Sequence, residues 1–523
     1  MEINTINSLL RPESYPEPTA SVRLVQTHIS FIFITDDYAY KIKKPVDFGF
    51  LNFTTIDRRR FYCGEEVRLN RRLCPDVYLG VAELRETSSG ASFCGEGRVI
   101  DYAVKMKRLP DELMLDRLLA EGKVTEQDIR RIAGAIARFH LKAERGETID
   151  KFGGIVSIRR NWEENFQTAE RFVGQSLSAE DLSLIKGYVG PFLAGNESLF
   201  AERVKNGFIR ECDGDIHAEN ICLTDPVAIF DCIEFSEHFR YSDTAADIAF
   251  FLMDLDFHQR SGFAGAFLDE YRKVTGDREL LPLLDFYKLY RAFVRGKVES
   301  LKMVGAEVSD AERTDAAQKA ERYFRLARGY ILRKRISPAL IITCGLMGSG
   351  KSAIASELAF ELGVEIFSSD AIRKVLTKTP TGERRHDGYG MGIYTPEVNE
   401  EVYGALLAKS EETLKGGRSI IADATFRRRG DRGRFAFLAA SLGVPFYIVH
   451  TFCPDSLAKE RLDSRAPDPK VVSDGRWEIY QPQREEFEPP DDAEAKVIRL
   501  DTSNKMGDNI RTVLKSLGIC NGE

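Results

Sequence analysis

Long apolar runs and patterned cysteines are both missing from this sequence. No stretch approaches the roughly 18–20 uninterrupted apolar residues that a membrane span requires. The opening segment MEINTINSLLRPESYPEP has neither the basic start nor the apolar core of a signal peptide. The nine cysteines are scattered singly, with no CxxC pair and no even spacing, which is typical of proteins from a reducing compartment. We therefore expect a cytoplasmic protein with no membrane partner.

An excess of positive charge is missing as well. The formal net charge is −7, which argues against a dedicated non-specific DNA-binding protein, because such proteins need a basic surface. Hydrophobic residues make up 43% of the chain and charged residues 30%, as in ordinary globular proteins. At 523 residues the chain is too long for one hydrophobic core. Since domains usually contain about 100–200 residues, several folding units are expected.

The first part of the chain predicts strands before helices. Residues 22–34 and 38–46 are rich in β-branched and aromatic residues, which indicates a hairpin. An amphipathic helix is predicted over 57–73, and strands are predicted near 77–84 and 98–108. Helical patterns then dominate as far as a domain boundary near residue 335.

The boundary follows a long charged helix predicted over 306–335, which Ser337-Pro338 closes. Beyond it, the apolar runs LIITCG, SIIADATF and PFYIVHTF alternate with helical segments. That alternation is typical of a parallel α/β sheet. We expect an α+β domain over residues 1–335 and an α/β domain over 336–523.

The most specific motif opens the second domain. Residues 345–352 match GxxxxGK[ST], follow the apolar strand 340–344 and lead into a helix, as a P-loop requires. Backbone N–H groups and the helix dipole hold phosphates at such a turn. We expect Lys351 to reach the β- and γ-phosphates of ATP and Ser352 to bind Mg²⁺. The predicted nucleotide-binding residues are Gly345, Gly348, Ser349, Gly350, Lys351 and Ser352.

Candidate acceptor-binding residues follow the next predicted strands. Asp370, after the strand-like run VEIF, is placed to accept a proton from a substrate hydroxyl. Arg373 lies one helical turn further on the same face and could grip a phosphate. Asp423 ends the run SIIAD and could orient Mg²⁺ or bind substrate, with a helix N-cap for the next segment as the alternative.

Arginines provide two further candidate features. Arg461 and Arg465 are one helical turn apart, which suits a lid over ATP or an ordinary solvated helix face. The segment 427–434 carries five arginines and could bind a phosphorylated or nucleic-acid substrate. An exposed basic helix start is the alternative for this segment.

These motifs resemble the P-loop kinases that include polynucleotide kinase, gluconate kinase and zeta toxins. The resemblance covers roughly residues 339–500 and depends on the P-loop, the S-x-D-x-x-R element ending at Arg373, and D-A-T-F. It implies that Asp370 is the base that activates the hydroxyl and that Arg461 and Arg465 belong to the lid. Relatives phosphorylate sugars, nucleotides and nucleic-acid ends, so the acceptor stays open.

A second set of catalytic residue types lies in the first domain. Asp215 and Asn220 bracket a tight loop in GDIHAEN, and two short apolar runs then predict a hairpin that returns Asp231 beside Asn220. Asn220 and Asp231 could share Mg²⁺ while Asp215 projects toward the acceptor hydroxyl. This is the D-x-x-x-x-N arrangement of kinases, followed by a metal-binding aspartate.

This half resembles the aminoglycoside phosphotransferase family within the protein-kinase-like fold, over roughly residues 20–300. The resemblance implies a bilobal domain with Asp215 as the base and with Asn220 and Asp231 as metal ligands. Asp213 departs from the family pattern, which has histidine before Gly-Asp. Asp247, in DTAADIAF, resembles the buried aspartate that braces the catalytic loop.

The same resemblance requires a lysine that anchors ATP on the third strand. Lys41 and Lys43 are two residues apart and share one face of that strand. Ala39-Tyr40-Lys41 fits the family pattern V-x-K better, so Lys41 is predicted as the anchor. Glu66 is its predicted helix partner, with an exposed helix carboxylate as the alternative. The glycine-rich loop of protein kinases is absent.

Taken together, the order of motifs resembles bacterial fusions of an aminoglycoside-phosphotransferase-like domain with a P-loop kinase. The leading hypothesis is a bifunctional kinase that uses ATP and Mg²⁺ at both sites to phosphorylate small-molecule hydroxyl acceptors. One alternative is phosphorylation of nucleotide or nucleic-acid ends by the P-loop domain, with the first domain regulating it. Another is an ATP-sensing scaffold with one inactive site.

Overall fold

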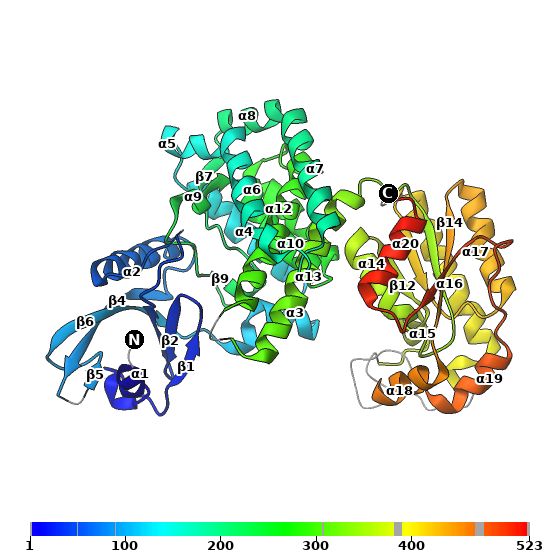
Figure 1. Ribbon diagram of the computed structural model, residues 1–523, viewed down its shortest axis with the longest axis horizontal. Helices are drawn as coiled ribbons and strands as arrows, with labels where there is room; N and C mark the ends of the chain where they lie inside the picture. Colours follow the sequence, from blue (N-terminus) through cyan, green and yellow to red (C-terminus); the bar gives the residue numbers. More distant parts are fainter. Residues whose placement is uncertain are drawn as a thin grey trace. The chain divides into compact units, whose positions relative to one another are not determined.

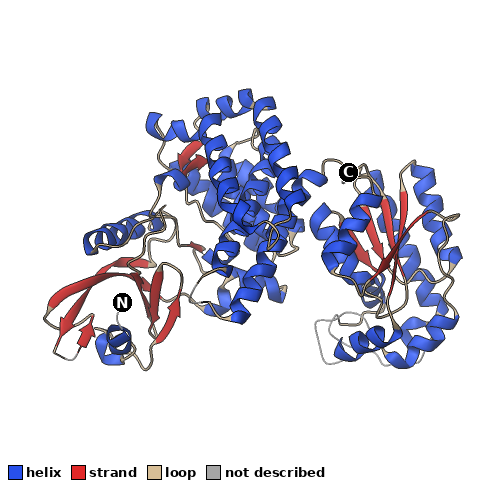
Figure 2. Cartoon of the chain, viewed as in Figure 1, coloured by secondary structure: helices blue, strands red, loops and turns tan. Residues whose placement is uncertain are grey.

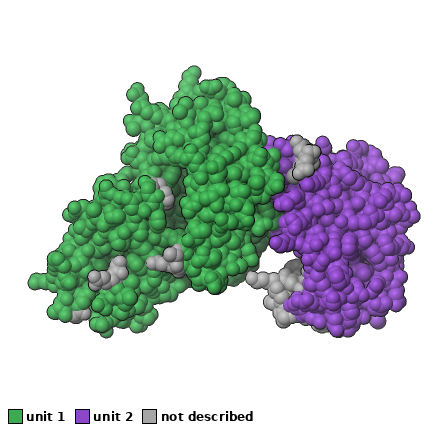
Figure 3. Space-filling model, in the orientation of Figure 1, with its two compact units in different colours: residues 1–327 green, residues 328–523 purple. Residues whose placement is uncertain are grey.

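The computed structural model divides the chain into two units, residues 1–327 and 328–523 (Figure 3). It describes residues 3–49, 51–88, 90–305, 308–380, 390–465 and 475–519. No helix formed by these residues is long and apolar enough to cross a bilayer.

The division falls eight residues before the expected boundary, inside helix α13 (Asp310–Leu332). Residues 328–332 of this helix belong to the second unit. Arg328 forms an ion pair with the buried Glu361, and Arg333, directly after the helix, donates to the carbonyl of Phe360 at 2.9 Å. The helical pattern continues without interruption across this point. A boundary set by packing inside one helix therefore leaves no turn signal in the sequence.

The first unit begins with a six-stranded antiparallel sheet in the order β1-β2-β3-β6-β4-β5. The predicted hairpin is present as β2 and β3, and β1 is split from β2 by a tight turn in which Thr27 N–H donates to the carbonyl of Ser30 at 2.9 Å. Helix α2 (Ile56–Asn70) starts at the N-cap Thr55 and packs on this sheet (Figure 1). The strands are β1 (Arg23–Gln26), β2 (Ser30–Ile34), β3 (Tyr38–Lys43), β4 (Tyr78–Thr87), β5 (Gly90–Ser92) and β6 (Arg98–Lys107).

A helical lobe follows the sheet in the first unit. Every residue of α10 (Thr244–Phe257) is buried, including the three aspartates Asp247, Asp254 and Asp256. The other helices of this unit are α1 (Ile3–Leu9), α3 (Leu115–Glu121), α4 (Glu126–Lys142), α5 (Glu147–Asp150), α6 (Ile155–Ala169), α7 (Ala179–Gly195), α8 (Glu197–Lys205), α9 (Glu237–Arg240), α11 (Ala264–Thr275) and α12 (Leu281–Met303).

Short strands inside the helical lobe carry the predicted catalytic segment. β7 (Ile209–Glu211) pairs with β10 (Tyr241–Asp243), and β8 (Ile221–Cys222) pairs with β9 (Ala228–Ile229) as the predicted hairpin. The segment GDIHAEN lies between β7 and β8. A sheet lobe with one packed helix, followed by a helical lobe with this loop, is the bilobal protein-kinase-like fold.

The second unit is an α/β domain with a five-stranded parallel sheet, as predicted. The strand order β12-β13-β11-β14-β15 places the P-loop strand β11 (Leu340–Cys344) at the centre. Figure 2 shows helices on both faces of this sheet. The other strands are β12 (Glu365–Ser368), β13 (Ile420–Asp423), β14 (Phe446–Phe452) and β15 (Lys496–Asp501). The helices are α14 (Lys351–Leu362), α15 (Ser369–Leu376), α16 (Pro396–Lys415), α17 (Arg429–Leu442), α18 (Asp455–Arg465), α19 (Tyr480–Glu485) and α20 (Met506–Ser516).

A buried arginine fixes the start of α10. The guanidinium of Arg203, fully buried, donates to both carboxylate oxygens of Asp243 at 2.8 and 2.6 Å and to Asp277 at 2.7 and 2.9 Å. Asp243 is also the N-cap of α10 and accepts a bond from Ala245 N–H at 2.8 Å. The arginine therefore holds the helix that carries Asp247.

We predict that Arg203→Ala lowers the free energy of unfolding of the first unit by about 3–5 kcal/mol, because it leaves two carboxylates buried without a counter-charge. Denaturant unfolding followed by the fluorescence of buried Trp162, in a Trp477→Phe background, measures this change. The exposed ion pair Arg160–Glu164 supplies the control: Arg160→Ala should cost less than about 1 kcal/mol. Equal effects of the two substitutions would contradict the prediction.

Candidate active sites

Lys41 lies where the two lobes of the first unit meet. Strand β3 pairs with β2 and β6 on its two sides, so Lys41 stands on a central strand. Its ammonium is 2.9 Å from the Glu66 carboxylate on α2 and also forms an ion pair with Asp231. The structure thus brings together three residues that are far apart in the sequence.

Glu66 is fully buried and contacts both lysines of the strand. Its second oxygen is 2.6 Å from the ammonium of Lys43, which also pairs with Glu234. Burial by itself raises the pKa of Glu66, but the charges of Lys41 and Lys43 outweigh burial and lower this pKa to about 2. An exposed helix carboxylate is therefore excluded as the interpretation of Glu66. Of the two lysines, Lys41 is the one next to Asp231.

The catalytic loop holds Asp215 close to Asn220. The amide nitrogen of Asn220 donates to the main-chain carbonyl of Asp215 at 3.1 Å and to its carboxylate at 3.3 Å. Phe230 N–H donates to the carbonyl of Asn220 at 3.0 Å, so the hairpin returns Asp231 next to Asn220. Because the amide nitrogen is engaged, the Asn220 side-chain oxygen is the atom left to bind a cation.

Asp215 is held in its ionised form by neighbouring cations. Burial alone would raise its pKa, but the charges of His217, Arg295 and Arg291 outweigh burial and lower it. His217 lies 3.6 Å from the Asp215 carboxylate, and this neighbour raises the pKa of His217 despite burial. His217 was not predicted as a site residue, although its place inside GDIHAEN is a signal that could have found it.

Asp231 has a left-handed backbone, with φ = 67°. This conformation is uncommon for residues other than glycine, although aspartate tolerates it. Two side chains support it: the hydroxyl of Tyr78 accepts from Asp231 N–H at 3.1 Å, and Asn70 accepts from Cys232 N–H at 2.9 Å. The side chain of Asp231 is 44% exposed, so it faces the open part of the site and not the core.

Asp247 supports the backbone of the catalytic loop by hydrogen bonds, which agrees with the role that the resemblance implied. It is fully buried and accepts from Asp213 N–H at 3.1 Å and Gly214 N–H at 2.8 Å, while His140 lies 3.0 Å from it. Arg291 donates to the Gly214 carbonyl at 2.9 Å. The loop backbone is therefore fixed by hydrogen bonds to its N–H groups, which Asp247 accepts, and to a carbonyl, which accepts from Arg291.

Asp213 fills the position of the family histidine as a neutral group. Burial, followed by the nearby charge of Asp247, raises the pKa of Asp213 to about 8. A protonated carboxyl group can both donate and accept hydrogen bonds, as a neutral imidazole does. One of its oxygens accepts from Asp215 N–H at 3.1 Å. The substitution thus keeps an uncharged supporting group next to the predicted base.

The P-loop of the second unit is shaped by glycines that no other residue could replace without a clash. A Cβ on Gly345 would lie 2.3 Å from the Thr451 carbonyl oxygen, and one on Gly348 would lie 2.9 Å from that of Ala458. Helix α14 starts after Gly350, which provides no side-chain cap. Its first N–H groups are therefore available to a phosphate. Lys351 folds over the loop and donates to the Leu346 carbonyl at 2.8 Å.

The carboxyl ends of neighbouring strands bring Asp370 and Asp423 to the same sheet edge. Ser368, at the end of β12, pairs in register with Asp423 at the end of β13, and Asp370 lies in the first turn of α15. Asp423 is buried and accepts from the hydroxyl of Thr343 at 2.7 Å. The next helix, α17, has Arg428 at its N-cap position, which excludes the N-cap interpretation of Asp423.

Two of the predicted arginines, Arg373 and Arg461, contact other parts of the second unit. Arg373 is buried, donates to the Ile393 carbonyl at 2.9 Å and stacks on Tyr394. Arg461 donates to Thr502 at 2.8 Å and to the P-loop carbonyl of Gly348 at 3.4 Å. The side chain of Arg465 lies outside the described residues.

Acidic residues neutralise the arginine cluster of segment 427–434. Each of the five guanidinium groups lies within 4 Å of a carboxylate, and the buried Arg432 forms a bidentate pair. The pairs are Arg427 and Arg428 with Glu486 at 3.4 and 3.7 Å, Arg429 with Asp491 at 3.9 Å, Arg432 with Glu494 at 2.7 Å and Arg434 with Glu400 at 2.8 Å.

Comparisons with known proteins bear on both units. Residues 340–490 match the family described as AAA domain. The Mycobacterium tuberculosis protein Rv2004c (strain H37Rv) is 33% identical over 411 residues, which cover 78% of this chain and 79% of that protein. The protein Mb2027c of Mycobacterium bovis matches to the same extent.

Solved structures are similar to each unit in turn. A gluconokinase from Sinorhizobium meliloti 1021 is 20% identical, with a TM-score of 0.26, and the match covers 35% of this chain and 92% of that one. The GDP complex of aminoglycoside 2′-phosphotransferase-IIIa is 12% identical, with a TM-score of 0.38, and covers 62% of this chain and 99% of that one. The fold and site geometry of the two units, with the domain match, support nucleotide-dependent phosphoryl transfer.

The raised pKa of Asp213 predicts a pH-dependent stability. The folded chain keeps a proton on Asp213 that the unfolded chain loses near pH 4, so this contribution to stability is present below about pH 4 and is lost as the pH rises through about 8. Asp213→Asn cannot titrate. Between pH 5.5 and 7.5 the parent chain should lose stability relative to the Asp213→Asn variant. The difference in free energy of unfolding, variant minus parent, should therefore increase by roughly 1 kcal/mol per pH unit.

Denaturant unfolding at several pH values, in the Trp477→Phe background described above, measures this difference. Asp225→Asn is the control, since the side chain of Asp225 is fully exposed, and it should leave the pH profile unchanged. Parallel profiles for Asp213→Asn and the parent chain would show that Asp213 is ionised in the folded protein.

Proposed function

We propose that this chain, which belongs to the family of the Mycobacterium tuberculosis protein Rv2004c, is an ATP- and Mg²⁺-dependent phosphotransferase with two catalytic sites. Each site transfers the γ-phosphate of ATP to a hydroxyl group, and the acceptors are small molecules. One observation carries the proposal: each unit has a lysine at a phosphate position and a separate carboxylate for the acceptor. These are Lys41 and Asp215 in the first unit and Lys351 and Asp370 in the second.

In the first unit, Lys41 pairs with the nucleotide phosphates. Glu66 keeps the ammonium charged and oriented, and phosphate oxygens replace Asp231 as its second partner. Asp231 and the side-chain oxygen of Asn220 are then the groups that would hold Mg²⁺, since hard oxygen ligands suit this ion. The bound ion would neutralise charge on the phosphates.

Asp215 accepts the proton of the acceptor hydroxyl. Its lowered pKa keeps it ionised near neutral pH, and an ionised carboxylate within reach of the hydroxyl acts as a general base. His217 and Asn220 fix its orientation. Transfer then depends on holding the hydroxyl in line with the γ-phosphate, which is a matter of position more than of covalent chemistry.

In the second unit, the P-loop amides and Lys351 bind the phosphates, and Ser352 would contribute to the Mg²⁺ site. Asp370 is the base for the acceptor hydroxyl, with Arg373 and Asp423 on the acceptor side. Arg461, which lies on α18 and contacts the carbonyl of Gly348, and Arg465 belong to the lid that excludes water. Asp423 is followed by Ala424-Thr425, without the adjacent glutamate that positions water in many ATPases.

Small molecules are favoured over nucleic-acid ends as acceptors because the arginine cluster carries its own counter-ions. A nucleic-acid strand would have to displace Glu486, Asp491, Glu494 and Glu400 to reach these guanidinium groups. The scaffold hypothesis is also less favoured, because both sites keep a base in addition to their nucleotide-binding groups. Such a base serves no purpose in a protein that only binds ATP.

Two aspartate variants test the roles in the first unit, in a Lys351→Ala background that silences the second. Asp215→Asn should reduce phosphate transfer about 100-fold or more and leave ATP affinity within a few-fold. Asp231→Asn should weaken the Mg²⁺-dependent part of ATP binding. Transfer of labelled phosphate and calorimetric titration with ATP measure the two effects. An equal loss of ATP affinity in both variants would contradict the assigned roles.

Asp370→Ala tests the second unit, in an Asp215→Asn background. Hydrolysis of ATP without an acceptor should be slow, and a suitable hydroxyl compound should raise turnover by orders of magnitude. Asp370→Ala should remove this stimulation while nucleotide affinity stays within a few-fold. A panel of sugars, nucleosides and 5′-hydroxyl oligonucleotides supplies the acceptors.

The matched control for Asp370→Ala is Asp508→Ala, an exposed aspartate in an ion pair on α20, which should behave as the parent chain. Rapid acceptor-independent hydrolysis that survives Asp370→Ala would identify the second unit as an ATPase instead of a kinase. Stimulation by oligonucleotides alone would assign it to nucleic-acid ends.

A further inference from the structure

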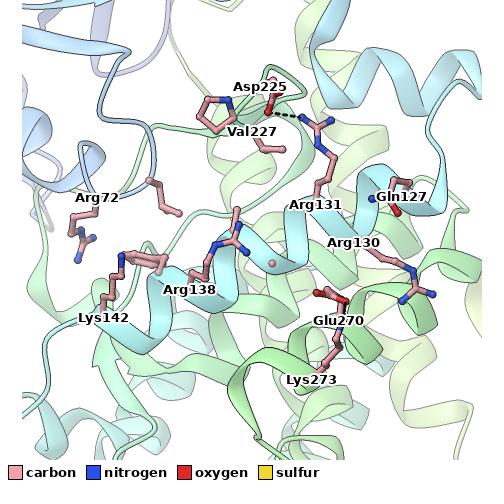
Figure 4. Close-up of a pocket in the computed structure, with 15 residues that line it drawn as sticks. Arg72, Gln127, Arg130, Arg131, Arg138, Lys142, Asp225, Val227, Glu270 and Lys273 are labelled. Carbon is pink, nitrogen blue, oxygen red and sulfur yellow. Dashed lines mark hydrogen bonds and ion pairs between the residues drawn. The ribbon is translucent and has the colours of Figure 1, made fainter.

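A basic pocket of about 760 Å³ lies in the first unit, on the side of α4 near the β8–β9 hairpin (Figure 4). Six of its lining side chains are cationic and two are carboxylates. The cationic residues are Arg72, Arg130, Arg131, Arg138, Lys142 and Lys273, and the carboxylates are Asp225 and Glu270. None of these residues takes part in the nucleotide site described above.

The pocket follows one face of α4. Gln127, Arg131, Arg138 and Lys142 are spaced by four, seven and four residues, so they project from the same side of the helix. Between them lie the small residues Gly134 and Ala135, and the guanidinium of Arg138 lies over Gly134, where an added Cβ would be 3.1 Å from it. Figure 4 shows Arg131 reaching from this helix to Asp225, and Arg138 on the same helix nearer to Lys142.

Two of the arginines are fixed by the surrounding protein. Arg72 donates to the carbonyls of Glu211 and Cys212 at 2.8 and 3.0 Å and stacks on Phe139. Arg131 donates to the carbonyl of Thr224 at 2.7 Å. Their guanidinium groups are therefore held at the pocket wall before any ligand arrives, which reduces the entropy that binding would cost.

Two other cations have no counter-charge of their own. Among the described residues, Arg138 and Lys142 form no ion pair or side-chain hydrogen bond, and both are exposed. The two carboxylates of the pocket are already engaged, Glu270 with Lys273 at 3.3 Å and Asp225 with Arg131 at 3.8 Å. Arg72 and Arg130 have carboxylate neighbours outside the pocket lining, Glu211 at 3.1 Å and Glu126 at 3.7 Å, so the surplus of positive charge comes from Arg138 and Lys142.

Like charges gathered in a concave surface raise each other's electrostatic free energy, and an anion that enters the pocket lowers it. We propose that this pocket is a ligand site, separate from both nucleotide sites, for a small molecule that carries at least two phosphate groups. Arginine favours phosphate because its planar donor fork matches two phosphate oxygens.

The size and spacing of the pocket favour a small ligand with two anionic groups. A volume of about 760 Å³ lies within the range of about 300–1,000 Å³ that is typical of small-molecule sites. Arg131 and Arg138 are seven residues apart on α4, which corresponds to roughly 10 Å along the helix axis. One phosphate can therefore contact Arg138 and Lys142, which have no carboxylate partner, while the other contacts the Arg131 end.

Calorimetric titration of the full chain tests this site, with both nucleotide sites saturated by Mg²⁺ and a non-hydrolysable ATP analogue. The probes are fructose, fructose 6-phosphate and fructose 1,6-bisphosphate, which share a sugar and differ in phosphate number. We expect the affinity to rise along this series. Arg138→Glu/Lys142→Glu should weaken bisphosphate binding at least tenfold. Both side chains are exposed and unpaired, so the fold should tolerate the change.

The matched control is Arg159→Glu/Lys205→Glu, which makes the same change in charge at two exposed positions of the first unit outside the pocket. It should bind the bisphosphate as the parent chain does. Equal weakening in both double variants would show a general charge effect and overturn the site. Absence of bisphosphate binding to the parent chain, or binding of a single-stranded oligonucleotide in its place, would also overturn the proposal.

Discussion

The buried carboxylate of Glu66 is the interaction on which the first unit depends. Two lysines of β3 and one carboxylate of α2 share a site that excludes water, and Asp231 and Glu234 approach it from the helical lobe. Charges buried in this way are tolerated only when each one has a partner, because the loss of hydration costs several kcal/mol for each ion. The network therefore fixes β3, α2 and the segment after β9 relative to one another, and this arrangement creates the nucleotide site.

The same rule explains the supporting parts of the catalytic loop. Asp247 and Asp213 are both buried under the loop, and two adjacent ionised carboxylates would repel each other. Asp247 receives two backbone N–H groups and the proximity of His140 and Arg291, so it carries the charge. Asp213 receives the proton instead. A chain that replaces the family histidine with aspartate thus keeps an uncharged group at that place.

In the second unit, the nucleotide site is held in place by close contacts between backbone segments, whereas buried charges hold it in the first. Gly345 and Gly348 let the loop lie against the carbonyls of Thr451 and Ala458, which a side chain at either position would prevent. Thr502 accepts from Arg461 and donates to the carbonyl of Ser349 at 2.9 Å. The P-loop is thereby tied to residues that follow β15, about 150 positions later in the chain.

Local patterns in the sequence were sufficient for the two fold classes, the P-loop and the loop from Asp215 to Asn220. Hydrophobic periodicity, turn residues and short motifs act over a few neighbouring positions, so one chain segment contains all the information. The same patterns found the hairpin that returns Asp231, because its strands and turn are contiguous. They also placed Lys41 on the face of a strand, where it could bind phosphate, and Asp370 just after a strand, where it could accept a proton from a hydroxyl.

Only the tertiary structure decided which distant groups meet. Glu66 is buried between two lysines, not exposed on its helix, because α2 packs on the sheet. Four of the five arginines after Phe426 pair with acids about 60 positions later, such as Glu486 and Glu494, and Arg434 pairs with the earlier Glu400. No local pattern encodes these pairings. The basic face of α4 is visible in the sequence as a spacing of four, seven and four residues. It becomes a pocket only when the segment at Arg72 and the hairpin at Asp225 fold beside it, because concavity is a property of several elements together.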